Sequence, residues 1–203
     1  MRHRMSYDDR LAHMLSVAEE SFGPRTHQRT ALPVGFHAGL PEVFYPSPTT
    51  IEIRLPFDYK AERERSCYML AHECVHVLSP CDLHSVTVLE EGLATSFAHS
   101  YIRDHPAGDW THNPEFWSRS GDHRYDIARA LVECFLATRP DAIRRLRSRE
   151  QFISRISAGL ISEIYPEISA FVASSLTARF WSDVPPPPPP AQPIWLAPKN
   201  ATT

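Results

Sequence analysis

The residues best suited to chemistry lie between positions 68 and 78. This stretch contains the pattern H-E-x-x-H, formed by His72, Glu73 and His76. On a helix, residues four apart lie on one face, so the two imidazoles can be directed at a single ion. Zinc binds neutral imidazole nitrogens at about 2 Å and, in a catalytic site, keeps one position for water. Glu73 is placed to take a proton from that water, so the pattern predicts metal-assisted hydrolysis.

The helix expected around this pattern also has an apolar side. At about 100° per residue, His72 and His76 lie within roughly 40° of each other on the helix surface. The opposite side carries cysteines and aliphatic residues, namely Cys67, Leu70, Cys74, Val77, Leu78 and Cys81. We expect this helix to begin at Asp58 or Ala61 and to end before Pro80. The alternative is an ordinary packed helix in which both histidines are structural.

Composition is typical of a soluble globular protein. The chain has 203 residues, of which 42% are hydrophobic and 22% charged, enough for one domain with a sizeable core. A net charge of −3 argues against a general binder of nucleic acid or anionic membranes. No run of about 18 apolar residues predicts a transmembrane helix, and the N-terminus lacks the apolar core of a signal peptide. Three cysteines on an apolar helix side behave as small hydrophobes, which predicts a reducing, cytoplasmic location.

The remaining pattern predicts an α+β fold that is mainly helical. A first helix is expected over residues 6–22, capped by Ser6 with Asp9 three residues on. A second helix is expected from about Val88, where the cost of Gly92 would be explained by close approach of the histidine helix. Further helices are expected over residues 125–137, 140–149 and, in two pieces, 151–181. In the helix over 125–137, the residues expected to face inward are Ile127, Ala130, Leu131, Cys134 and Phe135.

One strand completes the expected sheet. Residues 49–55 alternate, with Ile51, Ile53 and Leu55 on one side, and this half-buried strand could pair with an extended substrate or serve only the sheet. Residues 25–49 and 104–121 are expected to be irregular. We therefore expect a single domain over residues 1–183, with a short sheet and a C-terminal helical part.

Two segments have no expected role in chemistry. Residues 184–203 form a proline-rich tail, either a solvated spacer or a docking site for a proline-binding partner. Arginines between positions 144 and 155 form a basic run, read as a solvated helix face or a partner-binding patch.

A catalytic zinc site needs a third protein ligand, and two candidates follow His76. Asp82 lies six residues later, where the metzincins place their third ligand, although Ser79 replaces their glycine and no methionine follows the helix. Residues 89–94, Leu-Glu-Glu-Gly-Leu-Ala, resemble the glutamate-bearing helix of the gluzincins, the thermolysin-like and aminopeptidase N-like zinc peptidases. The resemblance implies that Glu91 is the third ligand, with Glu90 as the fallback.

A second segment resembles the aminopeptidase N-like enzymes. Residues 123–131 begin with His-Arg-Tyr-Asp and look like the segment that opens with a transition-state tyrosine in those enzymes. The resemblance implies that Tyr125 donates its hydroxyl to the oxyanion, with His123 as the other candidate donor. The alternative for Tyr125 is a tyrosine that caps the core. No Gly-x-Met-Glu-Asn stretch is present, which favours an endopeptidase over an aminopeptidase.

Together these features predict a minimal zincin-like core that hydrolyses peptide bonds of a protein or peptide substrate. His72, His76 and Glu91 would bind Zn²⁺, Glu73 would act as general base, and Tyr125 would stabilise the oxyanion. Two alternatives remain open besides the metzincin-like set with Asp82. One is a non-catalytic, zinc-stabilised interaction module, and the other is a peptidase that cuts one host protein.

Overall fold

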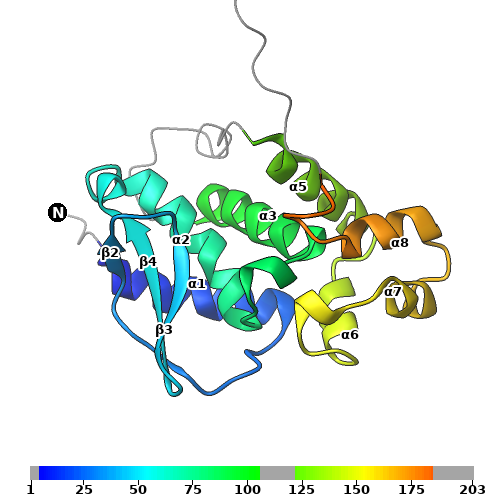
Figure 1. Cartoon of the computed structure of the whole chain (residues 1–203), viewed down its shortest axis with the longest axis horizontal. Helices are drawn as coiled ribbons and strands as arrows, with labels where there is room; N and C mark the ends of the chain where they lie inside the picture. Colours follow the sequence, from blue (N-terminus) through cyan, green and yellow to red (C-terminus); the bar gives the residue numbers. More distant parts are fainter. Residues whose placement is uncertain (1–4, 106–121, 185–203) are drawn as a thin grey trace, which may run out of the picture.

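The computed structural model describes residues 5–105 and 122–184. In these residues the fold is α+β and mainly helical, with a small four-stranded sheet, as the sequence predicts. The sheet lies at one end of the molecule and the C-terminal helices at the other, with α2 and α3 between them (Figure 1). The expected tail over 184–203 lies outside the described residues except for Val184, as does most of the expected loop over 104–121. In the described part of the chain, no helix is long and apolar enough to cross a membrane.

The first helix, α1 (Tyr7–Phe22), begins as predicted. The Ser6 hydroxyl accepts a hydrogen bond from the Asp9 amide at 3.1 Å. The Asp9 carboxylate in turn accepts a hydrogen bond from the Ser6 amide, which completes a capping box. Its apolar side is buried through Leu11, Met14, Leu15 and Ala18. At the other end Gly23 takes a positive φ of 96°, a conformation that glycine adopts without a Cβ penalty.

The sheet is built around β4 (Thr50–Pro56), whose Ile51, Ile53 and Leu55 are buried as predicted. β3 (Glu42–Ser47) pairs with β4 in antiparallel fashion from Thr50 to Arg54. β1 (Thr30–Ala31) and β2 (Gly35–His37) pair with β4 in parallel, at Thr50–Ile51 and Arg54–Pro56. Thr50 pairs with both β1 and β3, and Arg54 pairs with both β2 and β3. β1 and β2 therefore lie along one edge of β4, and β3 lies along the other.

Two predictions about this region are wrong. Residues 25–49 are not irregular, because they supply three of the four strands. An extended substrate also cannot pair with β4, because both of its edges are taken. The outer edge of β3 has no strand partner within the described residues.

The helix that bears the histidines is α2 (Arg63–Leu78), preceded by the 3₁₀ turn η1 (Phe57–Lys60). Its predicted apolar back is buried, namely Cys67, Leu70, Cys74, Val77 and Leu78. This back belongs to the main core together with residues of α1, β4 and α3. Cys81 is the exception, because the helix ends three residues before it.

Two helices complete the surroundings of α2. α3 (Val88–Asp104) is capped by the Thr87 hydroxyl, and α5 (His123–Leu136) is capped by Asp122. A Cβ on Gly92 would clash with the carbonyl oxygen of Ala128, so the helix that approaches Gly92 closely is α5, not α2 as expected. The predicted inward side of α5 is largely wrong, because Ile127, Ala130 and Cys134 are exposed. Of the five predicted residues, Phe135 is buried and Leu131 is half-buried.

The C-terminal helices are α6 (Ala142–Arg147), α7 (Ala158–Ile164) and α8 (Ala170–Thr177), at the end of the molecule opposite the sheet (Figure 1). Of these, α8 packs against α3 and α5, α7 packs against α8, and α6 packs against α1. The chain after α8 returns to the start of α3, where the Phe180 amide donates to the Val86 carbonyl at 3.0 Å. The basic run is not a uniformly solvated face. Arg147 is buried and donates to the carbonyls of Phe22, Gly23 and Pro24, so it joins α6 to the end of α1.

Candidate metal centre

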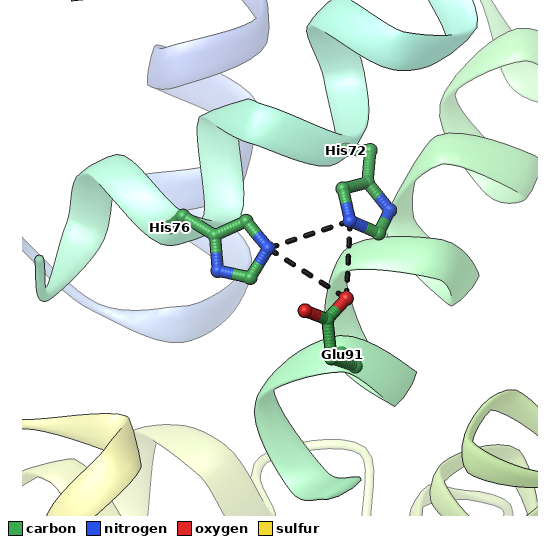
Figure 2. A group of neighbouring side chains, drawn as sticks. All are labelled: His72, His76 and Glu91. Atoms are coloured by element: carbon green, nitrogen blue, oxygen red, sulfur yellow. Dashed lines mark hydrogen bonds and ion pairs between the residues drawn. The ribbon is translucent and has the colours of Figure 1, made fainter. Parts of the chain in front are cut away.

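Three of the predicted residues converge between α2 and α3. His72 and His76 extend from successive turns of α2, and Glu91 extends toward them from the first turn of α3 (Figure 2). The two imidazole Nε2 atoms lie 3.4 Å apart. Oε2 of Glu91 lies 3.2 Å from Nε2 of His72 and 3.8 Å from Nε2 of His76. In the described part of the chain this is the one group of three His, Cys, Asp or Glu residues that could hold an ion.

The spacing of these three atoms fits zinc. Atoms bound to zinc at about 2.0 to 2.1 Å in a tetrahedron lie about 3.3 to 3.4 Å from one another. The observed separations of 3.2, 3.4 and 3.8 Å bracket that value. Oε2 of Glu91 is buried and lies within ion-pair distance of the Nε2 atoms of His72 and His76. A cation between the three atoms would compensate the charge of this buried carboxylate when both imidazoles are neutral.

The electrostatics of the site favour ionised forms of its members. Burial alone would raise the pKa of Glu91, but the adjacent His76 and His72 outweigh it and lower that pKa. Burial alone would lower the pKa of His76, but Glu91 and Glu90 raise it to about 10. The carboxylates therefore favour a positive charge at the position where the three side chains meet.

Glu73 lies beside the ligands but outside their group. Its side chain is buried, and the residue is 7% exposed. Burial raises the pKa of Glu73, and Glu91 adds to this rise, while His76 and His72 oppose it. A raised pKa makes the carboxylate a stronger base near neutral pH, which suits the predicted role in proton transfer.

Tyr125 stands on α5 and faces the site from a third helix. Its ring contacts that of His72 edge-on, with the centroids 6.0 Å apart. Behind it, the rings of Phe180 and Trp181 lie 4.9 and 6.3 Å away. Burial raises the pKa of Tyr125, and Glu91 and Glu73 raise it further, so the phenol keeps its proton for donation. His123, the other candidate donor, begins α5 and is exposed.

The two competing ligand candidates lie elsewhere. Asp82 caps the 3₁₀ turn η2 (Leu83–Ser85), where its carboxylate accepts from the amides of His84 and Ser85 at 3.0 and 3.1 Å. Glu90 points to the far nitrogen of His76, with Oε1 3.0 Å from Nδ1. The geometry therefore assembles the set with Glu91 and leaves both Asp82 and Glu90 out of it.

Two residues near the site were missed in the sequence. Cys81, expected on the apolar back of α2, instead places its Sγ 3.6 Å from Oε2 of Glu90. The second residue is Tyr45 of β3. Burial is the main cause that raises the pKa of Tyr45 to about 12. The charges of Cys81, Glu90 and Glu73 add to this rise, and the charge of Arg29 opposes it. Neither position has a local sequence signal, because both depend on where α2 ends and how β3 is placed.

Comparison of the chain with protein-family models, with curated proteins and with solved structures finds no match. A function must therefore be inferred from the side chains of the site. Fold alone would be a weak guide in any case, since one fold can carry many unrelated activities.

Proposed function

We propose that this chain is a zinc-dependent metallopeptidase of the gluzincin type that acts as an endopeptidase. His72, His76 and Glu91 would hold the zinc ion, leaving a fourth position for water or substrate. The observation that carries the proposal is the near-tetrahedral spacing of their three ligand atoms, with the buried carboxyl of Glu73 beside them. The resemblance of residues 89–94 to the gluzincin glutamate helix supports the type.

Each side chain has a role in the proposed mechanism. Zinc in a site of this composition lowers the pKa of water to about 7 and polarises a carbonyl. Glu73 accepts the proton of the attacking water and then delivers it to the leaving amine nitrogen. The Tyr125 hydroxyl donates a hydrogen bond to the oxyanion that develops on the peptide carbonyl.

The outer edge of β3, which pairs with no other strand in residues 5–105 and 122–184, supports an endopeptidase. An extended peptide can add to a free sheet edge through main-chain hydrogen bonds, without needing a free terminus. β3 also packs against α2, the helix that bears both histidines. We place the enzyme in the cytoplasm, because the four cysteines are free thiols.

The test is a pair of glutamate variants. Glu73→Gln should keep one zinc per chain but lose peptide-bond hydrolysis by a factor of at least about 10². Cleavage of a labelled unfolded protein and zinc content would be measured together. Glu20→Gln, the same change on the exposed side of α1, should retain both properties. Cleavage by Glu73→Gln at the wild-type rate would refute the mechanism.

The wild-type chain also decides between the alternatives. Bound zinc without cleavage of any unfolded protein would favour a non-catalytic, zinc-stabilised module. Cleavage of a single protein in a proteome screen for new termini would identify a peptidase of narrow specificity. Zinc lost from Asp82→Ala but kept by Glu91→Ala would support the metzincin-like ligand set instead.

A further inference from the structure

Glu90 is the most deeply buried carboxylate near the site, with 0% of the residue exposed. It is the neighbour of Glu91 on the first turn of α3, yet the two side chains reach opposite nitrogens of the same imidazole. Oε2 of Glu91 faces Nε2 of His76, while Oε1 of Glu90 lies 3.0 Å from Nδ1. A buried charge of this kind is costly unless it has a defined partner, and His76 is that partner.

This contact determines which nitrogen of His76 is available to an ion. A carboxylate oxygen only accepts hydrogen bonds, so Nδ1 of His76 must be the donor. The lone pair of the neutral ring is then on Nε2, the atom that faces His72 and Glu91. The same contact fixes the plane of the ring, because rotation about χ2 would break it.

The Glu90 carboxylate is itself held in place. The thiol of Cys81 lies 3.6 Å from Oε2 and 3.8 Å from Oε1 of Glu90, within reach of a weak S–H donation. On the backbone side, the Glu90 amide donates to the Thr87 hydroxyl at 3.3 Å. The side chain is thus fixed at its carboxylate end, and the helix turn that bears it is fixed by the cap.

We propose that Glu90 is a positioning residue that fixes the tautomer and orientation of His76 for a divalent cation, with Cys81 steadying the Glu90 carboxylate. This inference rests on the metal-binding part of the proposed function and not on catalysis. Partners that hold metal-ligating histidines in this way typically contribute a factor of about 10 to 100 to metal affinity.

The experiment measures zinc affinity of the full chain by competition with a chelating indicator, using the metal ion alone. Glu90→Gln keeps the size of the side chain and removes its charge, so its zinc affinity should fall by about 10- to 100-fold. Cys81→Ala should cause a smaller loss of the same kind, and Glu20→Gln should cause none. Wild-type affinity in Glu90→Gln would overturn the inference.

A spectroscopic readout separates positioning from a purely structural role. In the zinc-loaded wild type, the Nδ1 proton of His76 should give a downfield resonance typical of a hydrogen bond to a carboxylate. The resonance should move upfield in Glu90→Gln, and its absence from the wild type would overturn the inference even if a variant failed to fold.

Zinc binding with this resonance but without hydrolysis would sustain the inference and overturn the peptidase. A wild type that binds no zinc would overturn both.

Discussion

At the scale of single residues, Tyr125 is the side chain that would stabilise an oxyanion at the candidate metal centre in the proposed mechanism. Its ring contacts those of His72 and Phe180, with centroid distances of 6.0 and 4.9 Å. Burial and the charges of Glu91 and Glu73 raise the pKa of its hydroxyl, which stays protonated at neutral pH. A fixed, protonated donor at the edge of the site is what an oxyanion requires.

Tyr125→Phe should therefore lower kcat by a factor of about 10² to 10³, the usual loss for one oxyanion donor. Zinc content and thermal stability should stay near wild type, because the ring and its packing remain. Steady-state kinetics on a cleaved peptide, with metal analysis of the same sample, would measure both. Tyr59→Phe, on the turn before α2, is the matched control. An unchanged kcat in Tyr125→Phe would show that this tyrosine serves the core alone.

The sequence was a better guide to the three residues that converge, His72, His76 and Glu91, than to the neighbouring residues that contact them. His72 and His76 could be paired because the helical repeat places residues four apart on one face. Glu91 was predicted through a resemblance, since fifteen residues separate it from His76. Cys81 was misplaced because the predicted helix side was extended past Leu78, where the helix actually ends. Its contact with Glu90 depends on that ending and has no local pattern.

At the scale of elements, the close contact of α3 with α5 determines where Tyr125 stands. Gly92 makes this contact possible, because a Cβ there would clash with the Ala128 carbonyl and the Val132 side chain. The carbonyl belongs to the backbone of α5 and cannot move without the whole helix. α5 carries Tyr125 only three residues before Ala128, so any displacement there reaches the site.

Gly92→Ala should lower the free energy of unfolding by about 1 to 3 kcal/mol through overpacking. The gain in helix propensity, about 1 kcal/mol, should not compensate, because the clash is with backbone. Urea denaturation would measure the change. Gly159→Ala on α7 is the control, since its Cβ would meet only the Ser157 hydroxyl at 3.7 Å. Equal stability of the two variants would contradict the assigned contact.

The sheet shows why some elements could not be predicted. β1 and β2 are two and three residues long, too short to display an alternating pattern, and they exist through pairing with β4. β3 contains Pro46, which is tolerated in an edge strand but breaks a pattern in the sequence. The exposure of Ile127 has a similar cause, because α5 turns its small residue Ala128 toward Gly92 instead.

At the scale of the whole molecule, the hydrophobic core is built without the three candidate metal ligands. One cluster of buried residues joins α1, β4, α2, α3 and the C-terminal helices, and α2 enters it with the side opposite its histidines. Arg147 adds a tie between distant parts by donating to carbonyls at the end of α1. An ion would therefore join two helices that are already packed, unlike the small zinc domains that unfold without metal.

Removal of zinc should consequently lower stability without unfolding the chain. A ligand at 100 times its Kd stabilises the folded state by about 2.7 kcal/mol, so chelation should lower Tm by several degrees. Far-UV circular dichroism at 25 °C should not change, because the helices keep their apolar contacts. His72→Ala should abolish the response of Tm to zinc, whereas His84→Ala on the nearby turn should keep it. Loss of helical signal on chelation would instead indicate a structural zinc and favour the non-catalytic module over the peptidase.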